Sequence, residues 1–358
     1  MLSRRRLFAA SAAALASAGL ARPALSLAPG ASSAVAAEKA TFSMGTLISL
    51  RVYGPDEDRA GAWLDAADRE MNRLADILTV HADESPILEV MRRSGEAVEV
   101  PEEAAEAVAA SLRVARESGG AFEPTIGKLV DVWKIGFGGN RVPSEREIRE
   151  ALRFVGWQRV RVTESGGRHY VRVAKGQDLD LGGIAKGYIG SRMAMYLREL
   201  GAKKALLNLG GNVVLVGSNP EGNPWRIGLQ HPAEERNGFF AVLESEDESV
   251  ITSGAYERKM EVNGREYGHI LSAKTGRPVA TDLSSVSIAD RDGAKADAWC
   301  TAFFAMGKDR ALRILASRPD IEAVLMSRDC RTVWMTPGIE KRCEVTDSSV
   351  KTVAVLKR

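Results

Sequence analysis

The chain is poor in cysteine and in aromatic residues. Its three cysteines, Cys300, Cys330 and Cys343, are odd in number and widely spaced, which excludes a disulfide framework and a cysteine-based zinc site. A bridge between Cys330 and Cys343 stays open, whereas Cys300 is expected to be a small buried hydrophobe. Aromatic residues make up 6% of the sequence, the net charge is +2 and no basic stripe is present. A nucleic-acid partner is therefore not expected.

The sequence also lacks the common nucleotide-binding motifs and a long apolar run. Lys186 is followed by Gly187 and not by Ser or Thr, so the glycine-rich stretch around it is not a P-loop, and it does not match G-x-G-x-x-G. The apolar run near the N-terminus is broken by Gly19, Arg22 and Pro23, which leaves it too short to span a membrane comfortably.

The first residues have the pattern of an export signal. Paired arginines stand before Leu7 and Phe8, an Ala/Leu/Ser-rich run follows, and small-x-small sites occur at 34–37. The arginine pair indicates the twin-arginine route, which delivers folded proteins to the periplasm. We expect residues 1–37 to be this signal and 38–358 to be one domain. An uncleaved membrane anchor is the alternative.

The pattern of apolar and turn residues predicts an α+β fold. Ser144 and Glu147 have capping-box spacing at the start of one helix. Helices are expected at 58–78, 101–118, 144–154 and 184–200, followed by a final helix that carries Asp297. Strands or hairpins are expected at 40–52, 160–173, 205–216, 225–229, 239–244, 250–252, 260–271 and 286–289. These strands cluster instead of alternating with helices, which argues against a doubly wound sheet.

Asp297 and Thr301 are candidate metal ligands. They are four residues apart in an otherwise apolar helical run, so they share one face of the helix. Carboxylate and hydroxyl oxygens suit Mg²⁺, which completes its coordination with water and phosphate oxygens. The alternative is that Asp297 only complements the dipole at the helix N-terminus.

Two glycine-rich stretches and one histidine are further candidates. An apolar strand is expected to run into Gly182 and Gly183, just before a helix start with Lys186, where bare backbone and helix amides could bind phosphate. The alternative is a tight strand-to-helix turn. The second stretch, 208–212, interrupts a strand, which favours a bulge or close packing. His269 could relay a proton near neutral pH, although a lone histidine in a strand is usually structural.

Seven short motifs occur in an order that resembles the ApbE family, the FAD:protein FMN transferases. The resemblance covers residues 41–337 and implies a single T-fold-related domain with clustered antiparallel strands and packed helices. The motifs are M-G-T at 44–46, E-P-T-I-G-x-L-V-D-x-W at 123–133, D-L-G-G-I-A-K-G-Y at 180–188, N-L-G-G-N at 208–212, T-S-G-x-Y-x-R at 252–258, H-I-L-x-x-x-T-G-R-P at 269–278 and A-D-A-W-x-T at 296–301.

The resemblance implies a reaction and a set of site residues. FAD is split at its pyrophosphate with Mg²⁺, FMN moves to a Thr or Ser hydroxyl of an exported or membrane redox protein, and AMP leaves. Asp297, Thr301 and the carbonyl of Gly183 match metal ligands, and His269 and Asp297 match catalytic residues. Positions that match FAD contacts are Met44, His81, Ala121, Phe122, Glu123, Asp180, Lys186 and Leu271.

The chain departs from the family pattern at three places. His81 stands where many members have a flavin-covering Tyr, Ser272-Ala273 replaces a common Asp-Pro, and Cys300 occupies a position that is often Asp or Ser. The twin-arginine signal is similar to that of the branch linked to nitrous-oxide-reductase maturation. Two other functions stay open: an FAD pyrophosphatase that forms FMN and AMP, and a non-catalytic periplasmic FAD carrier.

Overall fold

The computed structural model describes residues 35–80, 84–234, 238–254 and 258–355. The chain divides into two units, Met1–Ala31 and Ser32–Arg358, and all described residues belong to the second. The predicted signal, apart from its last three residues, and the predicted flavin contact His81 lie outside the described residues.

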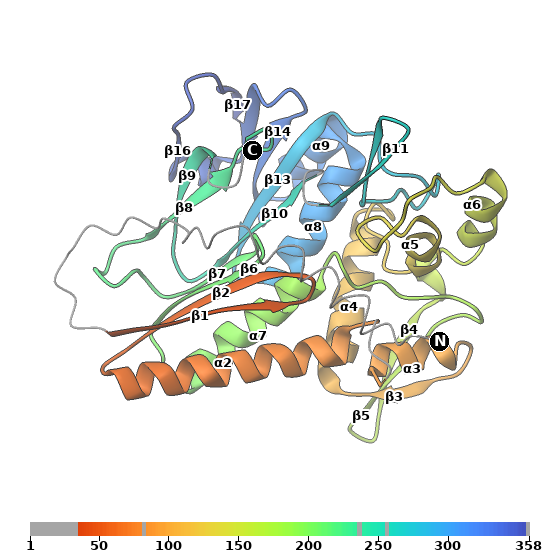
Figure 1. Cartoon of the computed structure of the whole chain (residues 1–358), viewed down its shortest axis with the longest axis horizontal. Coiled ribbons are helices and arrows are strands. Elements are labelled where there is room, and N and C mark those ends of the chain that lie inside the picture. The colour runs from red at the N-terminus through yellow and green to blue at the C-terminus, as the bar shows by residue number, and fades with distance from the viewer. Residues whose placement is uncertain (1–34, 81–83, 235–237, 255–257, 356–358) are drawn as a thin grey trace. The chain divides into compact units, whose positions relative to one another are not determined.

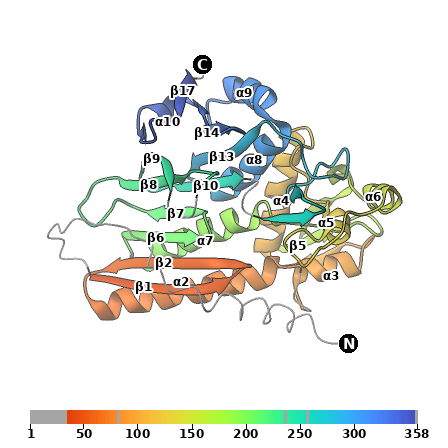
Figure 2. The same cartoon turned by 45° about the horizontal axis from the view of Figure 1, so that its top comes forward.

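A nine-stranded sheet forms the centre of this unit, and Figure 2 shows its strands in succession from β1 to β17. Neighbouring strands are antiparallel except β15 and β17, which are parallel. In spatial order the strands are β1 (Val35–Ser43), β2 (Thr46–Gly54), β6 (Lys204–Leu209), β7 (Val213–Val216), β10 (Ser249–Gly254), β13 (Leu283–Asp290), β14 (Glu322–Ser327), β15 (Thr332–Met335) and β17 (Lys351–Val355).

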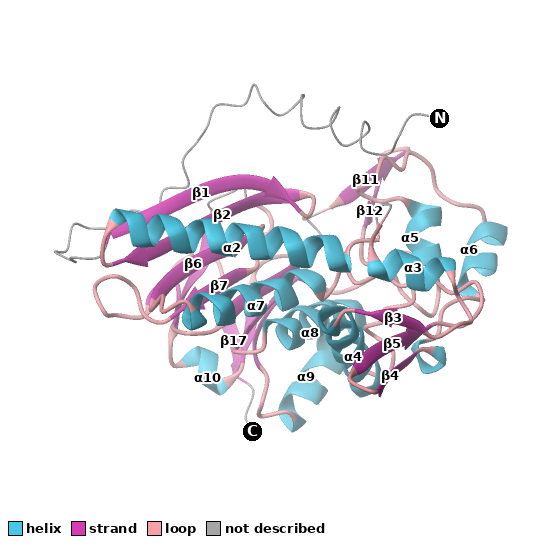
Figure 3. Cartoon of the chain, turned by 90° about the horizontal axis from the view of Figure 1, so that it is seen from below, coloured by secondary structure: helices cyan, strands magenta, loops and turns pink. Residues whose placement is uncertain are grey.

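Helices cover one face of this sheet and a smaller sheet covers part of the other (Figures 1 and 3). The side chains alternate between faces as the period of a strand requires: Leu50 and Leu207 pack toward the helices, whereas Tyr53 and Leu206 pack toward the small sheet. The covering helices are α2 (Glu57–Leu78), α7 (Ala185–Glu199) and α8 (Gly293–Met306). The small sheet is β8 (Trp225–Gln230), β9 (Phe239–Ser245) and β16 (Cys343–Val345).

The remaining elements surround the ends of the central sheet. A third apolar cluster, with Trp133 and Ile148 at its centre, joins two short helices to the β11–β12 hairpin. These elements are α3 (Pro86–Arg92), α4 (Glu102–Glu117), α5 (Gly127–Trp133), α6 (Glu145–Leu152), α9 (Lys308–Ser317), α10 (Pro337–Glu340), the hairpin β11 (Lys259–Val262) and β12 (Arg265–Gly268), and the sheet of β3 (Val98–Val100), β5 (Arg168–Arg172) and β4 (Arg161–Ser165).

The structure confirms the predicted α+β class and most predicted elements. α2, α4, α6 and α7 lie within two residues of their predicted bounds, and Ser144 and Glu147 form the predicted capping box. The hairpins that turn at Gly166-Gly167 and Asn263-Gly264 are present. Among the described residues, no helix combines the length and apolarity that crossing a membrane requires.

Three local predictions are wrong. Residues 40–52 are not one strand, because Met44 (φ 51°) and Gly45 (φ 73°) make the two-residue turn of the β1–β2 hairpin. No strand precedes Gly182; the segment is a loop held by a hydrogen bond from the Asp180 amide to the carbonyl of Pro124 (2.8 Å). The helix with Asp297 is not the final one, since α9 and α10 follow.

Candidate functional site

The two predicted metal ligands lie on one face of α8, one turn apart. Asp297 is buried and Thr301 is half-buried. The helix begins after Asp292, whose side chain caps the Lys295 amide, so Asp297 lies in the second turn. Its Oδ2 accepts a 2.9 Å hydrogen bond from the backbone N–H of Gly187 on α7. Asp297 therefore also interacts with the first turn of α7, in addition to its place near the start of its own helix.

Two glycines let α7 and α8 approach closely enough for that hydrogen bond. A Cβ atom on Gly187 would lie 2.1 Å from the carbonyl oxygen of Gly293 and 2.7 Å from the Cβ of Asp297. A Cβ on Gly293 would lie 2.6 Å from the carbonyl oxygen of Gly187. Real Cβ atoms do not come this close, so any side chain at either position would push the helices apart.

The Gly182-Gly183 turn meets the other end of the same face. A Cβ on Gly183 would lie 3.1 Å from Thr301 Oγ1 and 3.1 Å from a ring carbon of Phe122. The hydroxyl of Ser253, at the end of β10, is 3.5 Å from Thr301 Oγ1. The structure thus brings Gly183, Asp297 and Thr301 together, as the sequence predicted.

Burial raises the pKa of the Asp297 carboxyl above its usual value, although neighbouring groups favour the charged form. These groups are the charge of Lys186, the Gly187 N–H and the side chain of Asn212, each of which lowers the pKa. The Asn212 side chain is 1% exposed, and its amide faces the Asp297 carboxylate and favours its charged form.

These oxygen groups fit a hard divalent cation. The predicted ligands are one carboxylate, one hydroxyl and one backbone carbonyl, which suits an ion that keeps positions for water and phosphate oxygens. The described ranges contain no group of three or more His, Cys, Asp or Glu that could hold a metal. The set of Asp297, Thr301 and Gly183 would not form such a group, because it has a single carboxylate.

His269 is held in one tautomer by the backbone. Its Nδ1 is 3.1 Å from the carbonyl oxygen of Arg258, which can only accept, so Nδ1 carries the proton and Nε2 keeps a lone pair. Burial lowers the pKa of His269 to about 4, and the charges of Arg258 and Lys186 act in the same direction. The imidazole is therefore neutral at physiological pH and able to accept a proton.

Lys186 links this histidine to the metal-ligand face. Its positive charge lowers the pKa of both His269 and Asp297, so the ammonium group lies within electrostatic range of each. It lies in the first turn of α7, directly after the glycine turn. One cation beside two candidate catalytic groups is a suitable arrangement for neutralising a phosphate.

The β1–β2 turn borders the same region. A Cβ on Gly45 would lie 3.1 Å from Nη2 of Arg258, so this turn lies directly against the arginine whose carbonyl holds His269. On its other side, a Cβ on Gly210 would lie 2.3 Å from the side chain of Thr46. The stretch 208–212 is therefore the β6–β7 turn, and its packing against Thr46 confirms the predicted close contact.

Two of the three predicted FAD contacts at 121–123 are buried and make contacts within the protein. Phe122 is buried, and Ala121 is half-buried. The Glu123 carboxylate is also buried and accepts from the amide and hydroxyl of Thr125 (3.0 and 2.7 Å) and from the amide of Trp157 (3.2 Å). Burial raises the pKa of Glu123. This carboxylate organises the loop that precedes α5.

The other predicted FAD contacts lie on loops around the site. Met44 is half-buried in the β1–β2 turn. Asp180 accepts a 2.8 Å hydrogen bond from the Gly182 amide and so shapes the glycine turn. Leu271 is buried and pairs with Pro278. Beside it, Ser272 Oγ accepts from two backbone amides of the following turn, a role that Asp also fills in such turns.

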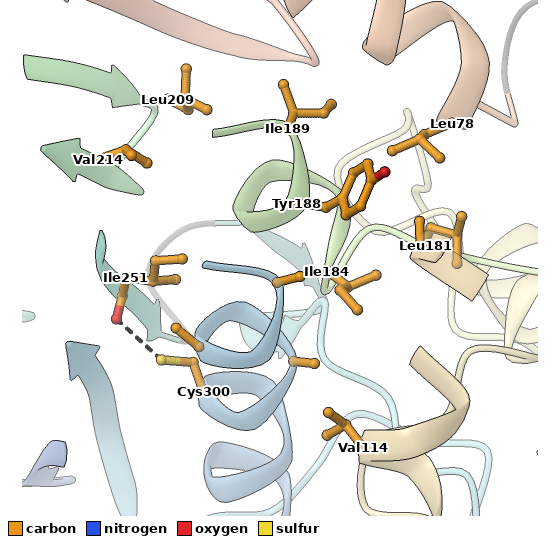
Figure 4. Close-up of a cluster of buried hydrophobic side chains, with 14 of the residues drawn as sticks. Leu78, Val114, Leu181, Ile184, Tyr188, Ile189, Leu209, Val214, Ile251 and Cys300 are labelled. Atoms are coloured by element: carbon orange, nitrogen blue, oxygen red, sulfur yellow. Dashed lines mark hydrogen bonds between the residues drawn. The ribbon is translucent and has the colours of Figure 1, made fainter. Parts of the chain in front are cut away.

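The cysteines take no visible part in the site. In Figure 4 the Cys300 side chain points from α8 toward Ile251 of β10, and its Sγ is 3.1 Å from the Ile251 carbonyl oxygen. Burial raises the pKa of Cys300 well above its usual value. The prediction of a small buried hydrophobe is confirmed. Cys330 and Cys343 are both free thiols, so the bridge that stayed open is absent.

Sequence reasoning missed three residues of the site: Asn212, Ser253 and Arg258. Each was noted only as a member of a motif. Their roles depend on contacts with residues at least 11 positions away in the chain, as the bond between His269 and Arg258 illustrates. The usable signal was that all three stand inside short polar motifs at the ends of predicted strands.

Comparisons with known proteins identify relatives of this chain. The sequence profile described as the ApbE family matches residues 44–325. A protein of Klebsiella pneumoniae named FAD:protein FMN transferase is 33% identical over 295 residues, which cover 82% of this chain and 90% of the relative. One of the same name from Treponema pallidum is 33% identical over 327 residues, covering 87% and 89%. The crystal structure of the ApbE protein of Thermotoga maritima superposes with a TM-score of 0.78 at 30% identity, covering 86% of this chain and 99% of that one.

Proposed function

Because the chain belongs to the ApbE family, we propose that it is an FAD:protein FMN transferase. It moves FMN from FAD to a Thr or Ser hydroxyl of an acceptor protein and releases AMP. The observation that carries this proposal is the convergence of Gly183, Asp297 and Thr301 at the α7–α8 contact, with Lys186 beside them.

Mg²⁺ is the cation that we assign to this set of oxygens. Asp297, Thr301 and the carbonyl of Gly183 would hold it. When bound, it supplies positive charge to the diphosphate of FAD, whose oxygens otherwise repel a nucleophile. Lys186 adds a second positive charge on the same side, and the glycine turn leaves room for the phosphates.

His269 is the residue that we assign to proton transfer. Its Nε2 has a free lone pair because Nδ1 donates to the Arg258 carbonyl. It accepts the proton of the acceptor hydroxyl as the new P–O bond forms. The phosphoanhydride bond of FAD breaks in the same transfer, and AMP leaves with the electron pair of that bond.

Hydrolysis is the second candidate function. The same geometry would split FAD to FMN and AMP if water took the place of the acceptor hydroxyl. A carrier without turnover is less well supported, since a carrier would need neither the oxygen groups of Asp297 and Thr301 on one helix face nor a neutral His269.

We also propose that the protein acts in the periplasm after export by the twin-arginine route. The arginine pair before Leu7 and Phe8 supports this location. The acceptor would then be an exported protein or the periplasmic part of a membrane protein.

Mass spectrometry separates the three functions. The protein is incubated with FAD, MgCl₂ and a threonine-containing peptide, and the peptide mass and AMP are measured. A peptide that gains one FMN together with AMP release supports transfer. AMP release without labelling supports hydrolysis, and the absence of both products supports the carrier.

A further inference from the structure

The exposed apolar side chains of this chain are not scattered evenly. Six large ones are the most exposed in the described part of the chain, with exposed fractions of 37–63%. Two of them, Phe42 and Leu47, flank the β1–β2 turn that lies against Arg258, and a third, Phe137, has its ring against the Arg258 guanidinium. Exposed apolar groups that gather in one place mark binding surfaces more often than isolated ones do.

Phe42 and Leu47 form a pair on the β1–β2 hairpin. They are direct partners on neighbouring strands, so their side chains point to the same face. That face is opposite to the one where Ile48 packs on the helices. The small sheet of β8, β9 and β16 covers it at Tyr53 but does not reach Leu47, which is 55% exposed. The fold therefore leaves this end of the sheet open.

Arg258 joins this pair to Phe137 and to the proposed base. The hairpin turn between Phe42 and Leu47 lies against its guanidinium, as the 3.1 Å spacing at Gly45 shows. The same guanidinium lies 5.6 Å from the centre of the Phe137 ring. The carbonyl of Arg258 accepts the Nδ1 proton of His269. One residue thus connects three exposed apolar side chains to the site of proton transfer.

We propose that Phe42, Leu47 and Phe137, the apolar rim, dock the acceptor protein by binding an apolar side chain that flanks its hydroxyl. This inference rests on the proposed transferase function. The two substrates need different surfaces: the diphosphate of FAD needs Lys186 and a cation, whereas an acceptor segment needs a surface that leads to His269. The apolar rim lies around Arg258, the residue whose backbone carbonyl holds His269.

The test uses two synthetic peptides with a single threonine. In one the threonine is flanked by leucine and phenylalanine, and in the other by serine and glutamine. The wild-type protein, FAD and MgCl₂ should label the apolar peptide more efficiently. In the double variant Phe42→Thr/Leu47→Thr, and separately in Phe137→Ser, the KM for the apolar peptide should rise by about tenfold. The KM for the polar peptide and the affinity for FAD should stay unchanged.

Phe239→Thr is the matched control. Phe239 is 45% exposed and also lies in a strand, but it belongs to the small sheet and not to the apolar rim. The Phe239→Thr variant should label both peptides as the wild type does. Melting curves of all variants check that the folds are equally stable.

Three results would overturn the inference. Equal labelling of both peptides by the wild type and the variants would show that the apolar rim does not dock the acceptor, and it would leave the proposed transferase function unaffected. A higher KM for FAD in the variants would assign the surface to the flavin. If the wild type labels neither peptide, the transferase proposal fails, and the docking surface fails with it.

Discussion

A single backbone carbonyl determines the chemistry of His269. The Arg258 oxygen accepts the Nδ1 proton, and burial keeps the ring neutral. The sequence could predict that a histidine was available, but its tautomer follows from the Arg258 carbonyl and its lowered pKa follows mainly from burial in the folded protein.

The pH dependence of FMN transfer should report this burial. A base must be neutral, and the pKa of His269 is lowered to about 4, so kcat/KM should be flat between about pH 5 and about pH 8. It should fall as the pH drops through about 4, because the ring then gains a proton. The measurement is the labelling rate of a threonine peptide across this range. A decline centred near 6.5 would show an exposed histidine instead.

Removing the charge of Asp297 should abolish cation binding without unfolding the protein. Asp297→Asn keeps an oxygen that can accept the Gly187 N–H but loses the negative charge, so FMN transfer should fall by about 100-fold or more. Differential scanning fluorimetry gives a readout independent of activity: MgCl₂ should raise the melting temperature of the wild type and not that of the variant. An equal rise of the melting temperature in the wild type and the variant would show that Asp297 is not a ligand of the proposed metal site.

At the scale of elements, the helix pair α7–α8 depends on missing side chains. The glycines next to Lys186 and the four-residue spacing of Asp297 and Thr301 are visible in the sequence. The contact between Gly187 and Gly293 is not, because it is set by how two helices cross.

Gly187→Ala should destabilise the protein by about 1–3 kcal/mol, since its Cβ would overlap Gly293 and Asp297. Gly61→Ala is the matched control: Gly61 also lies inside a helix, α2, but a Cβ there meets nothing within 4 Å. The control should stabilise by about 0.5–1 kcal/mol through helix propensity. Urea unfolding measures both. Equal effects of the two substitutions would contradict the close approach of α7 and α8.

Hairpins show where local pattern succeeds and where it fails. The turns at Gly166-Gly167 and Asn263-Gly264 were predicted because two turn residues separate two short strands. The turn at Met44-Gly45 was missed because Met is apolar and continues the pattern of the strand. Its positive φ is imposed by the pairing of β1 with β2 along nine residues.

At the scale of the whole molecule, export is the prediction that the structure leaves open. The predicted cut at 34–37 falls at the first residues of β1, which begins at Val35 and pairs with Gly54. Cleavage there would shorten an exposed end of β1 and leave the rest of the sheet intact. The site residues would keep their places, because they lie at the other end of β2.

Arg5→Lys/Arg6→Lys should keep the protein out of the periplasm, because the twin-arginine route requires the arginine pair. Arg22→Lys, a change of the same kind inside the predicted signal, should export normally. Cell fractionation and the intact mass of the periplasmic form check both the route and the cut. Export of the double variant at the wild-type level would contradict this route.

The sequence by itself determined the fold class, the helices with strong apolar periodicity, the family resemblance and the pairing of Asp297 with Thr301 on one helix face. These properties depend on neighbours along the chain or on motif order. Only the tertiary structure decided that Gly187 and Asn212 meet that face, that Arg258 sets the tautomer of His269, and that Glu123 organises a loop. The reason is physical: hydrogen bonds and close packing between distant segments exist only once the helices and strand ends have packed together.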